Sequence, residues 1–292
     1  MQPILFNLES DHDLAQALAI EVNAEVGKLD LRNFPDGESY LRVLSECQHR
    51  SVIVLCNLHH PDDKILKLIF LTHTLKSLGA ARIGLVTPYL AYMRQDKAFH
   101  PGEAVSSRPF AQLLSEHFDW LVTLDPHLHR YNSLDEIYSL KSSVVHAAPM
   151  IAEWINQHIA KPLLIGPDSE SEQWVSEVAH LAEAPFQVLE KVRHGDYSVE
   201  VSAPEIEHWK DHTPVLVDDI ISSGKTMLET LIHLHQLGLK SPTCIGVHGL
   251  FSDEDFNALA IKANIVTCNS VPHKSNDIDI SHTLSEAMLK WI

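Results

Sequence analysis

The chain has 292 residues, a formal net charge of −17 and a hydrophobic content of 45%. That length and apolar content are sufficient for two domains, each with its own core. The strong negative charge argues against nucleic acid or an anionic membrane as a partner. No apolar run reaches the length of a membrane span, and the four cysteines lack metal-type spacing, so we expect a cytoplasmic protein with free thiols.

Strand and helix patterns alternate in the first half of the chain. Short apolar runs predict strands at residues 4–6, 51–56, 83–86 and 121–124. Apolar residues at three- and four-residue spacing predict helices at residues 11–22, 64–78 and 105–117. Such alternation predicts an α/β fold with a mainly parallel sheet flanked by helices.

A second series with the same rhythm follows. Helices are predicted at residues 149–158, 171–182, 227–237 and 281–292, and strands at 163–165, 215–217, 243–247 and 265–266, with another beginning at 188. We therefore expect two similar domains, 1–146 and 147–292. The closing helix 281–292 is a candidate to pack back on the N-terminal domain.

The most informative stretch is the predicted strand 215–217 with the residues that follow it. Asp218 and Asp219 come first, and the loop then contains Ser222, Ser223, Gly224, Lys225 and Thr226 before a helix begins. Backbone N–H groups at a helix N-terminus favour an anion, and the hydroxyl groups of the loop add donors. Adjacent carboxylates suit ribose hydroxyls, directly or across a metal. The stretch predicts a cradle for a pentose phosphate.

This stretch has two other interpretations, a P-loop and an ordinary strand end. Gly224-Lys225-Thr226 invites a P-loop assignment, but the P-loop requires glycine at position 219, which is Asp. The simpler alternative is an ordinary buried strand end followed by a helix with a serine N-cap. That alternative gives no reason for the two adjacent acids.

Two segments of the first half carry candidate nucleotide-binding residues. In the turn 34–38, Phe34 is a candidate to stack on a base. Asp36, Gly37 and Glu38 complete the loop, and its two acids would accept hydrogen bonds. A plain hairpin loop is the alternative. Arg94, Gln95 and Asp96 follow a predicted strand, where open α/β sheets bind ligands. Arginine suits forked recognition of phosphate oxygens, so this segment is a candidate polyphosphate clamp, with a solvated loop as the alternative.

Four further residues follow predicted strands. His127 and Asp168 are candidates to converge on one divalent ion, Mg²⁺ being the usual ion beside phosphate oxygens and water. Lys191 and Arg193 are two residues apart and precede Gly195, as in a cationic lid that closes over transferring charge. Ordinary loop positions remain the alternative for all four.

Taken in order, these segments resemble the ribose-phosphate pyrophosphokinase family, in its compact archaeal type. Residues 248–252, His-Gly-Leu-Phe-Ser, resemble a further signature of that family, and the acids and loop after 215–217 resemble the signature of the type I phosphoribosyltransferase fold. The resemblance implies two phosphoribosyltransferase-like domains, the first on the ATP side and the second on the ribose-5-phosphate side. It also implies a homo-oligomer, a dimer or larger, with the ATP site near a subunit boundary.

The implied reaction moves a diphosphoryl group from ATP to the 1-hydroxyl of ribose 5-phosphate. By resemblance, Phe34 to Glu38 and Arg94 to Asp96 bind ATP, and Lys191 and Arg193 are catalytic. Asp218, Asp219 and residues 222–226 bind ribose 5-phosphate, and His127 and Asp168 hold Mg²⁺. Two alternatives stay open: a phosphoribosyltransferase, which consumes the product of this reaction, and a non-catalytic regulatory paralogue.

The chain also departs from the family pattern at several positions. Ser169-Glu170-Ser171 replaces small residues and glycine, Ser222 replaces a common acid, and Lys225 replaces a common glycine. Leu128-His129-Arg130 replaces a run of small residues and glutamine after His127. These positions are where we expect kinetics or regulation to differ.

Overall fold

The computed structural model describes residues 1–8, 12–167, 171–194, 198–202, 209–239 and 241–292; for 190–194 and 198–202 it describes the backbone. The chain divides into two units. One comprises Met1–Val145 and Ser281–Ile292, and the other comprises His146–Ile280. Each unit is described separately below.

The first unit is built on a six-stranded sheet in which every neighbouring pair of strands is parallel. In spatial order the strands are β2 (Glu25–Val26), β1 (Ile4–Asn7), β5 (Ser51–Leu55), β6 (Arg82–Thr87), β7 (Trp120–Leu124) and β8 (Lys141–Val145). The helices are α1 (Asp13–Glu21), α2 (Asp62–Ser77), α3 (Ser107–His117) and α8 (Ser281–Met288), with a short 3₁₀ helix at Leu134–Glu136. An antiparallel hairpin, β3 (Leu29–Asn33) and β4 (Ser39–Val43), lies beside α2.

The second unit repeats this plan. Its sheet is also six-stranded and parallel, in the order β10 (Phe186–Val188), β9 (Pro162–Gly166), β13 (Thr213–Ile221), β14 (Thr243–Gly249), β15 (Asn264–Cys268) and β16 (Asn276–Ile278). The helices are α4 (Ala148–His158), α5 (Glu172–Leu181), α6 (Lys225–Gln236) and α7 (Asp253–Ala260). An antiparallel hairpin, β11 (Glu190–His194) and β12 (Ser198–Ser202), again separates the second and third strands of the sheet. The predicted architecture of two similar parallel α/β folds is therefore confirmed.

Numbered along the chain, the strands of both sheets follow the order 2-1-3-4-5-6. The direction of winding reverses between the first and third strands, which are β1 and β5 in one unit and β9 and β13 in the other. Ligands of open α/β sheets bind outside the carboxyl ends of the strands at this reversal. In the second unit, the carboxyl end of β13 is the stretch that contains the two adjacent acids.

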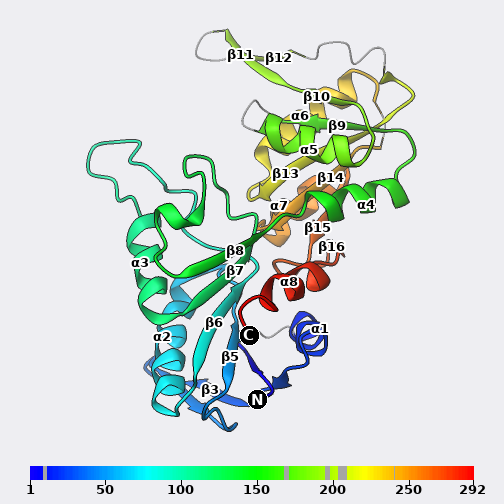
Figure 1. The fold of residues 1–292 in the computed structure, drawn as a ribbon. Helices are drawn as coiled ribbons and strands as arrows, with labels where there is room; N and C mark the ends of the chain where they lie inside the picture. Colours follow the sequence, from blue (N-terminus) through cyan, green and yellow to red (C-terminus); the bar gives the residue numbers. More distant parts are fainter. Residues whose placement is uncertain (9–11, 168–170, 195–197, 203–208, 240) are drawn as a thin grey trace. The chain divides into compact units, whose positions relative to one another are not determined.

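The last helix of each series belongs to the other unit. Helix α4 follows β8 in the chain but packs on α5 and lies beside β16, whereas α8 follows β16 but packs on α1 and lies beside β7 and β8 (Figure 1). Beyond α8, the indole Nε1 of Trp291 donates to Ser143 Oγ at 3.0 Å. Arg82 Nη1 donates to the carbonyl oxygen of Trp291 at 2.8 Å. Backbone and side chain of the final turn are thus both tied to the first unit.

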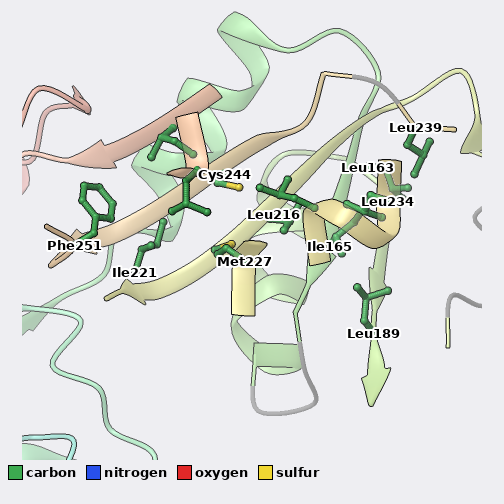
Figure 2. Packing of buried hydrophobic residues seen from close by; sticks show 13 residues of the cluster. Leu163, Ile165, Leu189, Leu216, Ile221, Met227, Leu234, Leu239, Cys244 and Phe251 are labelled. Atoms are coloured by element: carbon green, nitrogen blue, oxygen red, sulfur yellow. The ribbon is translucent and has the colours of Figure 1, made fainter. Parts of the chain in front are cut away.

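Apolar runs place the strands of the second unit in its core. Figure 2 shows β9, β13 and β14 contributing side chains that meet the inner face of α6. Leu163, Leu216, Cys244, Met227 and Leu234 are all at most 1% exposed. Full burial of one such aliphatic side chain stabilises the fold by about 1.5–3 kcal/mol. This packing holds the start of α6 rigidly against the end of β13.

Candidate functional site

The predicted cradle lies at the junction of β13 and α6. The sequence predicted a strand that ends at residue 217, with Asp218 and Asp219 after it. In the structure β13 continues to Ile221, so both acids lie on the strand. The strand is longer because β14 pairs with it as far as Ile221. Both acids are half-buried, and the carboxylate of Asp218 accepts the backbone N–H of Asp219 at 3.0 Å. That hydrogen bond fixes one carboxylate against the backbone at the sheet edge.

The loop after β13 leaves the N-terminus of α6 without a side-chain cap among the described residues. The N-cap is Gly224, in the left-handed conformation at φ 64°, so the alternative of a serine N-cap is wrong. A Cβ on Gly224 would come within 2.5 Å of Leu259 Cδ1, so both conformation and space require glycine here. The first N–H groups of α6 therefore lack a side-chain cap, which is the arrangement an anion needs.

The residues that carry the hydroxyl and ammonium groups of the cradle lie just before that helix end and in its first turn. Ser223 and Lys225 are exposed, whereas Ser222 and Thr226 are half-buried. Lys225 is the first residue of α6. The arrangement brings the predicted cradle residues together in one short segment of the second unit.

Three other predicted residues of the second unit are only partly described. Asp168 lies outside the described residues. Lys191 and Arg193 lie on β11, opposite Val201 and Val199 of β12, so the backbone is extended there. Their roles remain predictions.

The turn that contains Phe34 closes the β3–β4 hairpin of the first unit. Phe34 N–H donates to the carbonyl of Glu38 at 2.7 Å, Gly37 adopts φ 94°, and the carboxylate of Asp36 accepts the Glu38 N–H at 3.3 Å. The Phe34 ring is 40% exposed and meets the Tyr40 ring edge-on. The Arg32 guanidinium carbon lies 5.3 Å from the centroid of Phe34. Arg32 was not among the predicted site residues; it lies on β3 two residues before Phe34, and this alternation was the available signal.

The candidate polyphosphate clamp follows β6, and two of its three side chains are committed to contacts within the unit. Gln95 Oε1 accepts a hydrogen bond from Ser106 Oγ at 2.6 Å. Nη1 of Arg130 contacts both carboxylate oxygens of Asp96, at 2.7 and 3.0 Å, and the Asp96 side chain is only 2% exposed. Arg94 is exposed. Arg94 is thus the member best placed to meet a ligand, while Gln95 and Asp96 shape the segment.

The candidate metal ligand His127 lies in the loop after β7. Its backbone has φ 55°, and Asp125, buried two residues earlier, has φ 32°. The ring of His129 lies 4.0 Å from that of His127, between centroids. In the sequence, His129 stands out only as a departure from the family pattern, although its alternation with His127 is visible there. Oxygen ligands for a metal are present in the second unit as Asp218 and Asp219.

Comparison with known proteins gives consistent results over the whole chain. A family model described as the N-terminal domain of ribose phosphate pyrophosphokinase matches residues 3–117, and one described as a phosphoribosyl transferase domain matches residues 133–282. A ribose-phosphate pyrophosphokinase of Methanobrevibacter smithii is 30% identical, covering 96% of this chain and 97% of its own. A ribose-phosphate pyrophosphokinase of Saccharolobus solfataricus is 31% identical, covering 94% of this chain and 95% of its own.

The fold also matches a solved structure. The crystal structure of phosphoribosylpyrophosphate synthetase from Mycobacterium smegmatis superposes with a TM-score of 0.86, at 24% identity, covering 99% of this chain and 98% of that one. This similarity shows a shared fold. No helix in the described part of the chain is both long and apolar enough to cross a bilayer.

Proposed function

Because the chain belongs to the ribose-phosphate pyrophosphokinase family, we propose that it transfers the β,γ-diphosphoryl group of ATP to the 1-hydroxyl of ribose 5-phosphate. The products are phosphoribosyl pyrophosphate and AMP, for use in nucleotide biosynthesis. The observation that carries the proposal is the junction of β13 and α6. There, two half-buried carboxylates precede a helix end that the described side chains leave uncapped, at the point where the sheet reverses its winding.

The two units take different substrates in this proposal. The second unit binds ribose 5-phosphate, because an uncapped helix end suits the 5-phosphate and carboxylates accept hydrogen bonds from the ribose hydroxyls. The first unit binds ATP, with Phe34 against the base and Arg94 on the phosphates. Asp36 and Glu38 lie beside Phe34 at the tip of the hairpin and bind polar groups of the nucleoside. We assign the boundary between these functional domains to residues 146 and 147.

Catalysis in this reaction is a matter of position and charge. The 1-hydroxyl of ribose attacks the β-phosphorus, the bond to the α-phosphate oxygen breaks, and no covalent intermediate with the protein is needed. Charge spreads over the phosphate oxygens in the transition state, and fixed cations stabilise it. Lys191 and Arg193, on the β11–β12 hairpin, supply that charge. Asp218 and Asp219 hold the sugar so that its 1-hydroxyl is aligned.

A divalent ion completes the proposed site. Asp218 and Asp219 are oxygen donors, which fit Mg²⁺, and His127 is a nitrogen donor in the first unit. We propose His127 and Asp168 as the groups that hold Mg²⁺, with Asp218 and Asp219 available to its water shell. Such an ion would neutralise part of the negative charge on the phosphate groups.

The test is a pair of substrate-dependence measurements on the purified chain. With ATP, Mg²⁺ and ribose 5-phosphate, we expect AMP release that stops when ribose 5-phosphate is omitted. A chain that releases no AMP but joins a free base to phosphoribosyl pyrophosphate is a phosphoribosyltransferase, and the proposal fails. A folded chain that binds ATP without turnover is a regulatory paralogue, and the proposal again fails.

We further propose that the chain works as a homo-oligomer, a dimer or larger, with the ATP site near a subunit boundary. Support comes from the exposed hydrophobic side chains of the first unit, which include Leu31 and Phe34 on the hairpin and Leu66 and Phe70 on α2. Strand β4 of the hairpin packs beside α2, and contiguous exposed apolar surface is typical of a face that a partner covers. Light scattering at assay concentration checks this; full activity from a monomer contradicts it.

A further inference from the structure

The loop after β7 places two imidazoles side by side, and the proposed function uses only one of them. The rings of His127 and His129 have centroids 4.0 Å apart and planes inclined by 48°. One imidazole nitrogen of His127 lies within 4.8 Å of one of His129. Two nitrogens bound to one ion at about 2.0–2.1 Å are at most about 4.2 Å apart. A small side-chain rotation is therefore enough to put both nitrogens on the same ion.

The backbone builds this pair at a cost in strain. His127 N–H donates to the carbonyl of Asp125 at 2.8 Å, and His129 N–H donates to the carbonyl of His127 at 3.1 Å. These successive two-residue turns bring alternate residues together. Asp125 and His127 both have positive φ, at 32° and 55°. Backbone strain of this kind persists only where the surrounding structure enforces it, and it concentrates at functional sites.

The local charges favour a cation at His127 and His129. Asp125, in the same turn, is an acid, and the nearest cation along the chain, Arg130, is paired with Asp96.

A second histidine pair provides a contrast. The rings of His59 and His60 are also 4.0 Å apart, inclined by 45°. Burial, together with the neighbouring His60 and Lys64, lowers the pKa of His59 to about 4. The Lys64 ammonium that disfavours a proton there also disfavours a metal ion. The two histidine pairs thus have the same ring separation, but a nearby ammonium disfavours a cation at His59 and His60. The His59–His60 pair is therefore a matched control.

We propose that His127 and His129 together bind a divalent transition-metal ion, of the class from Mn²⁺ to Zn²⁺, and that His129 shifts the metal preference of this protein away from Mg²⁺. Imidazole nitrogen suits Co²⁺, Ni²⁺ and Zn²⁺, whereas Mg²⁺ prefers oxygen. The inference deepens the proposed function and rests on it for the role of the ion, since His127 already belongs to the metal site there. Binding itself is measured without turnover.

The test is a Co²⁺ titration of the full chain without nucleotide, followed by visible absorption. We compare the wild type with His127→Ala, His129→Ala and the control His60→Ala. The wild type should show one saturable high-affinity site that a large excess of Mg²⁺ displaces poorly. Loss of a group next to a metal ligand already costs about 10–100-fold in affinity. His127→Ala and His129→Ala should therefore each weaken Co²⁺ binding by at least about tenfold, and His60→Ala should leave it unchanged.

A further variant tests the preference and not merely the binding. His129→Asp keeps a ligand but replaces nitrogen with oxygen, so the ratio of Co²⁺ to Mg²⁺ affinity should fall. His129 is exposed, and circular dichroism checks that each variant remains folded. The inference is overturned by a wild type with no saturable Co²⁺ site, by equal Co²⁺ affinity in His129→Ala, or by an unchanged ratio in His129→Asp. Normal Co²⁺ binding without AMP release contradicts the proposed function alone.

Discussion

Arg130→Ala should loosen the segment that carries Arg94, Gln95 and Asp96. In the structure, Arg130 Nη1 contacts both carboxylate oxygens of Asp96, at 2.7 and 3.0 Å, and only 2% of the Asp96 side chain is exposed. The substitution leaves that carboxylate buried without its cation. A hydrogen bond to a charged group contributes about 1.5–3 kcal/mol. Because the Arg130 side chain is 40% exposed and solvent screens it, we expect a loss of about 2 kcal/mol.

Calorimetry or circular dichroism should show this loss in the unfolding of the first unit. For a unit of this size, about 2 kcal/mol lowers the midpoint temperature by roughly 4–8 °C. The control is Arg108→Ala, which removes an exposed arginine of α3 in the same unit. A double-mutant cycle with Asp96→Asn isolates the pair. Additive effects of the two substitutions, or equal melting of Arg130→Ala and Arg108→Ala, would refute the reasoning.

Three further predictions concern single side chains. Lys191→Ala should lower kcat by roughly 10²–10³-fold with little change in the KM for ATP, because a lid cation acts chiefly on the transition state. A steady-state kcat within a few-fold of the wild-type value removes Lys191 from the mechanism. If the Lys225 ammonium contacts the 5-phosphate, Lys225→Gly should raise the KM for ribose 5-phosphate about 10–100-fold with kcat little changed. An unchanged KM means that the Lys225 side chain faces solvent. Burial, with His60 and Lys64 as neighbours, lowers the pKa of His59 to about 4, so the unfolded chain binds more protons than the folded chain between pH 4 and 6.5. The free energy of unfolding should therefore fall as pH falls through that window, by at most about 1.4 kcal/mol per pH unit. Denaturant titrations at several pH values should show a smaller slope for His59→Gln.

The fold could be predicted because its signals are local. Buried parallel strands appear as continuous apolar runs such as 51–56, and the helices between them show their periodicity directly. The edge strands β2, β8 and β16 escaped prediction. The strand expected to begin at residue 188 was wrong, because β10 pairs with β9 from Phe186 and ends at Val188. β2 has two residues and β16 has three, which is too few for any pattern. The β3–β4 hairpin was noticed only at its turn, because β3 is mostly exposed, β4 is mostly half-buried, and neither strand is a continuous apolar run.

The candidate site was predictable where it is contiguous in sequence. Asp218 to Thr226 lie on one strand end and one helix start, so their order alone brings them together. The partnership of Arg130 with Asp96 joins residues 34 positions apart, and no sequence period reports such a contact. The importance of His129 depends in the same way on a turn with positive φ, which histidine adopts without any sequence mark. Such features come from tertiary packing and required the structure.

In the proposed reaction, a diphosphoryl group moves in one step from ATP to ribose 5-phosphate. The most direct measurement uses ATP labelled at the β-phosphorus, with the products separated by chromatography. We expect all transferred label to appear in phosphoribosyl pyrophosphate, with one unlabelled AMP released for each molecule formed. Label retained in ADP, with ribose 5-phosphate gaining a single phosphate, would contradict it.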